Sequence, residues 1–479
     1  MNGLANLTAL VFGGLFAWMV IARSGEQEGR GRKYLRYLNS GVLPSYVIMM
    51  LVINGMYASW EGDSQAWTGL VSWIFEVFLQ VSLYFLLLAL VLPLLRRYIR
   101  AGACAMLWII PNYLYLTYST NRYTMPRWVI PLPGGWLEAA GVIWLAGMLA
   151  VLGWKIVAHL RFRRWLLREA EPVSDPEVLS VWEETVEWAR IKRMRYRLVI
   201  SPQATTPMSI GLFWTSTRVV LPRRHYTPEE LKLIFRHELV HISREDAWNK
   251  FFLAFCTAVC WFNPLMWLAV RRSSEDLELS CDETVLSELK AGERRQYAQL
   301  ILRTAGDSRG FTTCLSASAT ALRYRLRSIM KPGRKLPGAL LVGVIFFPLY
   351  VTCGQVGLAY GAGTGQADLF PGEAGTVSLT EATWTGERPY VPVSCRDEGA
   401  LEDYLSSLTL YRLFRDDANS SAQDQPLLLT YDTPKGPLSM TLWRNYVTVM
   451  PSWEEITQWH NYYVSGGLDW ERLEGLFDR

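Results

Sequence analysis

The chain has 479 residues, of which half are hydrophobic and only 19% are charged, and tryptophan occurs 21 times. This balance excludes a disordered chain, a coiled coil, a collagen-like repeat and a disulfide-rich secreted mini-protein. The length and the apolar composition predict a membrane protein of several domains with sizeable water-soluble parts.

Charge is distributed unevenly along the chain. Residues 355–479 contain 8 Lys and Arg against 18 Asp and Glu, whereas the rest of the chain has 40 against 26. A basic body with an acidic tail is typical of a membrane protein whose two parts face opposite sides. The basic residues flank apolar segments and do not line one helix face, so we expect no direct binding to nucleic acid.

Six apolar segments are candidates for membrane spans: residues 4–22, 42–60, 70–95, 103–117, 136–154 and 336–352. Basic residues follow the first, third and fifth segments and precede the last, and such flanks mark the cytoplasmic side. Because they follow the first segment, we interpret it as a retained span and not as a signal peptide. The short segment 103–117 must cross as well, because the chain has to return outward before the fifth span. This arrangement places residues 160–335 inside and the acidic tail outside.

Glu76 lies within the third apolar segment. An acid inside a membrane span is a functional candidate by default. The alternative is that Glu76 lies near the outer end of the span and reaches water.

Residues 237–241 read HELVH and carry the clearest chemical signal of the chain. Positions i and i+4 of a helix share a face, so His237 and His241 can bind one Zn²⁺ while Glu238 reaches a metal-bound water. A capping box with proline at the first helical position, at residues 227–230, supports a helix here. Both histidines could instead be satisfied core residues.

Residues 218–221, which precede this helix, are interpreted as a strand. A strand beside such a helix can hold an extended peptide by backbone pairing.

A hydrolytic zinc site needs a third protein ligand and an open position for water. Glu278 and Asp282 are four residues apart on an expected helix, so Glu278 can bind zinc while Asp282 accepts a hydrogen bond from a ligand histidine. Glu275 competes as the ligand. Cys281 lies only about 60° round the helix from Glu278 and competes too, but a carboxylate is the usual partner of two histidines in hydrolytic sites.

The uncharged run 251–270 separates the two halves of this site and is long enough to span a membrane. If it did, His241 and Glu278 would lie on opposite sides and could not share a metal. Both flanks are basic and Asn263-Pro264 interrupts the run. We therefore expect a helical hairpin or dipping element near the membrane surface, with an ordinary buried helix as the alternative.

Together these residues resemble the integral-membrane zinc peptidases of the BlaR/MecR type, the sensor-transducers of beta-lactam resistance. The resemblance covers roughly residues 1–350. It is carried by the HELVH motif, Arg244 and Asp246, and by residues 211–213, 220–222, 261–264 and 278–282. It implies a gluzincin, a zinc peptidase with Glu278 as third ligand. We expect Asp282 and Asp246 to orient the ligand histidines.

The tail departs from the beta-lactam sensors, whose external domain is a penicillin-binding fold with a Ser-x-x-Lys nucleophile. Residues 355–479 number only 125 and contain neither Ser-x-x-Lys nor Lys-Thr-Gly. Sensing of beta-lactams is therefore not carried over to this chain.

The tail is predicted as a small α+β domain. The expected elements are a Gly-rich linker at 361–375, a helix at 401–413, a three-stranded meander at 426–431, 438–443 and 446–450, and a closing helix at 468–477. Its many Tyr and Trp residues suit a binding surface, although packing in a small core is favoured. Cys353 and Cys395 fall on the external side, where they can pair.

These features predict a mostly α protein: multi-pass membrane helices with an inserted α+β gluzincin zinc-peptidase domain and a small extracellular α+β C-terminal domain. The expected boundaries are 1–159 for an N-terminal membrane region of about five spans, 160–335 for a cytoplasmic zinc metallopeptidase, 336–354 for the last membrane helix and 355–479 for an extracellular sensor.

The expected function is a zinc endopeptidase of the cell membrane that cleaves a cytoplasmic protein in response to an external signal. By resemblance the substrate is a DNA-binding repressor. Cleavage of the chain itself, with the dibasic Arg294-Arg295 as an exposed candidate site, is left open, and so is a homodimer. The other expected partners are the lipid bilayer and an extracellular ligand. The alternatives are a constitutive quality-control or processing peptidase and a non-catalytic zinc-binding receptor scaffold.

Overall fold

The computed structural model describes most of the chain from Ser64 onward. The described residues are 64–109, 111, 125–134, 136–189, 196–213, 215–244, 246–287, 289–304, 319–330, 335–336, 338, 341, 344–345, 347–349, 352, 354–370, 377–384, 391–415, 426–451 and 459–478. The expected spans 4–22 and 42–60 lie outside these residues, as do residues 110 and 112–117 of the expected span 103–117.

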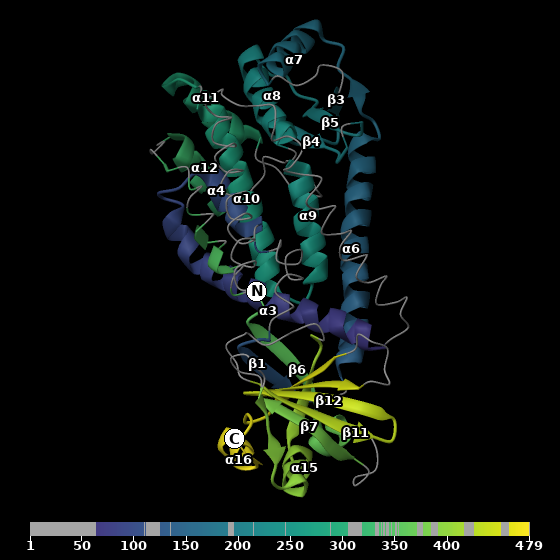
Figure 1. Cartoon of the computed structure of the whole chain (residues 1–479). Helices are drawn as coiled ribbons and strands as arrows, with labels where there is room; N and C mark the ends of the chain where they lie inside the picture. Colours follow the sequence, from purple (N-terminus) through teal and green to yellow (C-terminus); the bar gives the residue numbers. More distant parts are fainter. Residues whose placement is uncertain are drawn as a thin grey trace.

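Long helices occupy the middle of the molecule, a helical region with a small sheet lies at one end, and a large sheet lies at the other (Figure 1). Two helices are long and apolar enough to cross a membrane: α3 (Ser64–Leu95), through Val71–Leu95, and α6 (Leu137–Leu167), through Ala139–Leu167. Large apolar side chains project outward from both, among them Leu83, Leu90 and Val142. A helix that is apolar on its outer face fits a lipid environment. The third and fifth predicted segments therefore correspond to membrane-capable helices.

The run 251–270 forms a helical hairpin. Helix α9 (Asp246–Val259) and helix α10 (Pro264–Leu286) contact each other and are joined by a short turn. Asn263 begins α10, because its Oδ1 accepts a hydrogen bond from the backbone N of Leu265 at 2.9 Å, and Pro264 takes the first helical position. The hairpin returns the chain, so the ends of α9 and α10 that carry Asp246 and Glu278 lie at the same end of the bundle (Figure 1).

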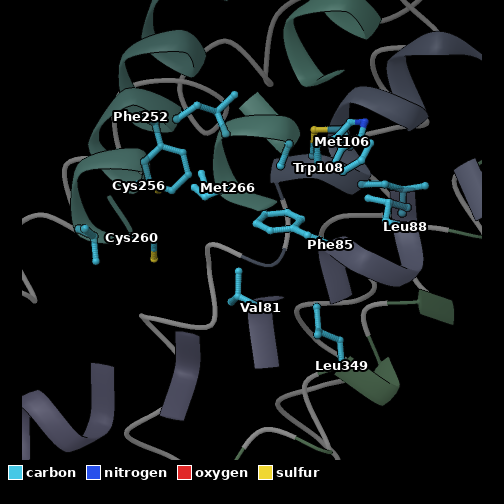
Figure 2. Packing of buried hydrophobic residues seen from close by; sticks show 14 of the residues in the cluster. Val81, Phe85, Leu88, Met106, Trp108, Phe252, Cys256, Cys260, Met266 and Leu349 are labelled. Atoms are coloured by element: carbon cyan, nitrogen blue, oxygen red, sulfur yellow. The ribbon is translucent and has the colours of Figure 1, made fainter. Parts of the chain in front are cut away.

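The hairpin packs against α3, α6 and the short helix α4 (Ala101–Ile109). Figure 2 shows this core, in which Phe252 and Cys256 of α9 face Met266 of α10, and Phe85 of α3 lies near Trp108 of α4. The large apolar contact fixes α10 against α3 and α4.

The peptidase region contains a four-stranded sheet in the order β2-β3-β5-β4, with bounds Glu171–Pro172, Arg197–Ser201, Arg218–Pro222 and Met208–Ile210. Helices α7 (Pro176–Trp188) and α8 (Pro228–Ser243) pack together beside it. The expectation that strand 218–221 pairs with a peptide is wrong, because β5 is already paired with β3 on one side and β4 on the other. The edge strand that contacts α8 is β4.

Two further helices complete the peptidase region, α11 (Ala291–Thr304) and α12 (Ala319–Met330). The expected cleavage site Arg294-Arg295 lies within α11, and the Arg294 side chain is half-buried, donating to the backbone oxygen of Leu289 at 3.1 Å. The expected exposed site is therefore helical, with only Arg295 exposed.

The C-terminal region is built on a nine-stranded sheet in the order β1-β6-β10-β14-β13-β12-β11-β7-β8. The bounds are Trp128–Leu132 for β1, Val356–Thr364 for β6, Ser378–Trp384 for β7, Val391–Pro392 for β8, Thr409–Leu413 for β10, Leu427–Thr433 for β11, Gly436–Trp443 for β12, Tyr446–Pro451 for β13 and His460–Val464 for β14. Strand β1 comes from between the membrane segments and runs parallel to β6. The tail thus completes its sheet with a strand from the N-terminal half of the chain.

Small elements cover this sheet: α14 (Gly365–Leu369), α15 (Glu398–Ser406), α16 (Trp470–Gly475) and the two-stranded pair β9 (Ser394–Cys395) and β15 (Phe477–Asp478). The predicted meander is confirmed as β11, β12 and β13, and the closing helix as α16. Cys353 lies outside the described residues, so its pairing with Cys395 stays a prediction.

Two expectations for the tail are wrong. The segment 401–413 is helical only to Ser406 and continues as strand β10. The Gly-rich segment 361–375 is no linker over its described part, which contains the end of β6 and helix α14. Its glycines allow close approach: Gly361 has φ +71°, and a Cβ on Gly365 would lie 1.8 Å from the backbone oxygen of Leu405.

Glu76 is buried where α3 meets the C-terminal sheet, with 5% of its surface exposed. Its carboxylate accepts hydrogen bonds from Arg415 Nη2 at 2.7 Å and from the backbone N of Leu358 at 2.9 Å. The expectation that Glu76 reaches water is therefore wrong, because a cation and a backbone amide of the tail replace the water.

Candidate active site

Helix α8 begins as the sequence predicts. The Thr227 side chain accepts from the backbone N of Glu230 at 3.3 Å, and the Glu230 carboxylate accepts from the backbone N of Thr227 at 3.2 Å. This capping box satisfies donors that the first turn of a helix leaves without a partner. The helix then continues through Ser243 without a break, so His237 and His241 share one face.

The two histidines on this face of α8 and Glu278 of α10 converge. His237 Nε2 lies 3.2 Å from His241 Nε2, and Glu278 Oε2 of α10 lies 3.6 Å from each of them. A divalent ion bound at about 2.1 Å from each of three ligand atoms at tetrahedral angles holds them about 3.4 Å apart. The spacing therefore fits one metal ion. Glu278 Oε2 is buried and makes no hydrogen bond with the described residues, which also suits a ligand atom.

Glu238 lies on α8 next to His237 and is fully buried. A carboxylate adjacent to a ligand histidine is the expected general base of this motif. Its burial and its position beside His237 are consistent with this role.

His241 has a carboxylate partner on its other ring nitrogen. Asp246, the first residue of α9, lies 2.8 Å from His241 Nδ1 through Oδ2, and it is fully buried. A carboxylate at Nδ1 keeps the proton on that nitrogen and leaves Nε2 able to bind a metal. The structure thus brings Asp246 to one of the histidines it is expected to orient.

Asp282 does not make the direct hydrogen bond to a histidine that we expect from the sequence. Its Oδ1 is 3.6 Å from His237 Nδ1. Between them lies Tyr297 of α11, whose hydroxyl is 2.8 Å from His237 Nδ1 and donates to Asp282 Oδ1 at 2.7 Å. Arg325 of α12 then donates to both oxygens of Asp282, each at 2.7 Å.

Tyr297 and Arg325 are the site residues that the sequence reasoning missed. They are 60 residues from His237 and 43 residues from Asp282 along the chain. No motif connects them to the HELVH pentad, and only the packing of α11 and α12 against α8 and α10 brings them in.

The two competing ligands differ in position. Glu275 forms ion pairs with Arg271 and Arg272 and is not among the converging side chains. Cys281 is buried with its Sγ 3.4 Å from His237 Nδ1, and it forms a compact group with both histidines. Its sulfur approaches the ring nitrogen opposite to the one that faces Glu278. An ion held by the two Nε2 atoms is therefore better matched by Glu278.

The cluster is strongly polarised. Burial alone would lower the pKa of His237, but the adjacent Cys281 and Glu278 raise it to about 9. Burial alone would raise the pKa of Glu278, but His241 and Lys250, whose Nζ lies 3.4 Å from Glu278 Oε1, hold it well below its usual range. The site thus contains imidazoles and carboxylates in ionised form. A divalent cation that binds there would replace protons of the imidazoles.

Two histidines and a carboxylate converging at a capped helix, set at the end of a bundle of membrane-capable helices, are typical of membrane metallopeptidases. Residues 134–329 match the family model described as BlaR1 peptidase M56. The resemblance to BlaR/MecR sensor-transducers is thereby confirmed.

Two similar proteins match part of the chain. The chain is 26% identical over 185 residues to the regulatory protein BlaR1 of Bacillus licheniformis, covering 38% of this chain and 30% of that protein. It is 26% identical over 171 residues to the methicillin resistance mecR1 protein of Staphylococcus aureus strain Mu50, covering 34% of this chain and 27% of that protein. The chain thus matches less than a third of the length of these relatives.

Proposed function

We propose that the protein is a zinc endopeptidase of the cell membrane. The observation that carries this proposal is the convergence of His237 Nε2, His241 Nε2 and Glu278 Oε2 within 3.6 Å of one another. These three atoms would hold the ion. When bound, zinc supplies a Lewis acid that polarises a peptide carbonyl and lowers the pKa of water.

The residues of the chain provide the rest of the chemistry. Glu238 accepts a proton from the attacking water and returns it to the departing amine. Asp246 keeps the proton of His241 on Nδ1. Strand β4, the last strand of its sheet and a neighbour of α8, is where we place the extended substrate chain.

Two substitutions separate binding from chemistry. Glu238→Gln should retain zinc and lower kcat/KM for protein cleavage by about 10²–10⁴-fold, because only the base is removed. Glu278→Ala should lose zinc itself. Zinc content by metal analysis and cleavage by terminal-peptide profiling of producing cells measure the two effects. Full cleavage by the Glu238→Gln protein would contradict the role of Glu238 as the general base.

We further propose that the peptidase responds to a signal received by residues 355–479 outside the cell, with residues 160–335 in the cytoplasm. The pairing of β1 with β6 requires the segment 128–132 and the tail to lie on the same side of the membrane. Helix α6 supports opposite locations for the two regions: Leu137 packs with Leu358 near the large sheet, and Leu166 packs with Val199 in the peptidase sheet (Figure 1).

Helix α3 offers a route between the two regions. In its first half, Glu76 forms an ion pair with Arg415 of the tail. Just beyond its end, Arg96 Nη2 donates to Asp276 Oδ2 of α10 at 2.8 Å. Asp276 is two residues from Glu278 on the same helix, so a displacement of α3 would reach a metal ligand through two buried ion pairs.

The proposed substrate is a cytoplasmic repressor, by resemblance to sensor-transducers. Cleavage of the chain itself at Arg294-Arg295 requires the first turns of α11 to unwind, since a peptidase binds an extended chain. Quantifying peptides that end at Arg294 or Arg295 in cells producing the wild-type and Glu238→Gln proteins decides this point.

A second candidate, a receptor scaffold with structural zinc, is favoured by one observation. Cys281, His237 and His241 bring their ligand atoms within 4.8 Å of one another, so these three side chains would hold a structural ion without Glu278. Cobalt-substituted protein distinguishes the two readings. A sulfur-to-cobalt charge-transfer band that disappears in Cys281→Ala supports the scaffold, and the absence of such a band from the wild-type protein supports the peptidase.

A constitutive processing peptidase would instead keep cleaving its substrates when the tail is uncoupled from α3.

A further inference from the structure

We propose that Tyr297 and Arg325 are positioning residues of the metal site, acting on His237 through Asp282. This inference deepens the proposed function and depends on it, since it concerns the histidine that would hold the ion. Tyr297 acts on the nitrogen at the far side of the imidazole ring. Arg325 acts on that nitrogen through Asp282, and its Nη1 also lies 3.6 Å from Glu278 Oε2, the third proposed ligand atom.

The hydroxyl of Tyr297 connects two groups that cannot bond directly. It is 2.8 Å from His237 Nδ1 and 2.7 Å from Asp282 Oδ1, whereas these two atoms are 3.6 Å apart. A phenol can accept one hydrogen bond while donating another. Because the carboxylate can only accept, Tyr297 donates to Asp282 and is left to accept from His237 Nδ1–H. This direction leaves His237 Nε2 without a proton and facing Glu278.

Arg325 fixes the other end of this chain of hydrogen bonds. Its Nε donates to Asp282 Oδ2 and its Nη2 to Oδ1, both at 2.7 Å, in the two-point geometry that suits a guanidinium and a carboxylate. Arg325 and Asp282 are each 1% exposed. The arginine therefore compensates a carboxylate charge that has no water, and it holds both oxygens in the plane that Tyr297 needs.

The two histidines are thus oriented by different means. His241 has Asp246 directly at Nδ1 from the next helix, α9. His237 depends on Tyr297 of α11 and Arg325 of α12, two elements that follow the ligand helix α10. Soon after α12, Lys335 forms an ion pair with Glu283, and Leu336 bridges to Ile99. The affinity for metal is therefore linked to the docking of α12 on the peptidase region.

Zinc affinity measured by chelator competition on the full chain in detergent tests this proposal without any activity assay. Tyr297→Phe keeps the ring and removes only the hydroxyl, so zinc affinity should fall about 10–100-fold. Arg325→Met should lower it at least as much. Adding Tyr297→Phe to Arg325→Met should then lower it little further, because Tyr297 acts through Asp282, which Arg325 holds in place. Arg325→Lys, which keeps the charge but not the two-point geometry, should fall between the wild type and Arg325→Met.

Matched controls are Tyr431→Phe, a buried tyrosine of the tail, and Arg303→Met, an exposed arginine of α11. Both should leave zinc affinity unchanged. Zinc affinity unchanged in Tyr297→Phe, or lost only in proportion to a lower melting temperature of the metal-free protein, would overturn the proposal. Arg325→Met risks misfolding, but Tyr297→Phe decides the question alone. If Glu278→Ala also keeps full affinity, the proposed metal site itself fails, which is a different result.

Discussion

Each of the two histidines proposed as metal ligands has its own partner at Nδ1, Asp246 for His241 and Tyr297 for His237. The direct contact from Asp246 to His241 is a single hydrogen bond to a fully buried carboxylate. The chain from His237 to Arg325 has more members and reaches a separate helix. An ionised, buried cluster of this kind is held together by complete pairing, because any buried charge left alone is costly.

Asp246→Asn tests the direct contact. The amide keeps the shape but removes the negative charge, so His241 loses the partner that fixes its tautomer, and zinc affinity should fall about 10–100-fold. Chelator competition measures the change. Glu275→Gln is the matched control, because this nearby acid pairs with Arg271 and Arg272 and should not affect zinc. An equal loss of zinc affinity in both variants would mean that the total negative charge near the site, and not the contact of Asp246 with His241, determines zinc affinity.

At the element scale, the helices of the site were predictable and their supports were not. The capping box, the proline at the first helical position and the HELVH spacing are local features, and α8 forms as they predict. Asn263-Pro264 likewise predicted the turn of the α9–α10 hairpin. Tyr297 and Arg325 arrive by packing of α11 and α12, for which the sequence offers no spacing rule. Local patterns also misled where tertiary contacts decide: residues 409–413 have helical spacing but join the sheet as β10.

The close-packed glycine at the start of α14 gives a sharp test at this scale. Gly365→Ala should destabilise the C-terminal region by about 1–3 kcal/mol or more, because the new Cβ would lie 1.8 Å from the backbone oxygen of Leu405. Thermal unfolding and limited proteolysis of the tail measure the effect. Gly399→Ala in α15, where the nearest atom is 3.5 Å away, is the control and should change stability little. A flexible linker would tolerate both substitutions equally.

At the scale of the whole molecule, the membrane helices and the tail form a connected body. Arg415 donates to Glu76 Oε2 and to the backbone oxygens of Gly354 and Val356, all within 3.1 Å. Asn461 in turn donates to the backbone oxygen of Arg415 at 2.6 Å. In the proposed sensor, a movement of these strands would act on α3 through short, buried polar contacts.

Replacing one member of the ion pair tests this coupling. Glu76→Gln or Arg415→Met leaves a buried charge without its partner, and each should lower the free energy of unfolding by about 3–5 kcal/mol. The double variant should recover part of this loss, a coupling that thermal unfolding of the full chain in detergent can measure. Additive losses in the double variant would show that Glu76 and Arg415 do not act as a pair. Basal zinc affinity should remain, since Glu76 is twenty residues along the chain from Arg96, which contacts helix α10.

The parallel pairing of β1 with β6 has a consequence for biogenesis. The ribosome makes residues 128–132 more than two hundred residues before their partner strand, so the first edge of the sheet has to wait while the whole peptidase region is synthesised. The tail can complete its sheet only when both strands have been delivered to the same compartment. Correct insertion of the intervening segments into the bilayer is therefore a precondition for maturation of the last domain, and a chain threaded the wrong way should be recognisable to the cell by its unfinished sheet.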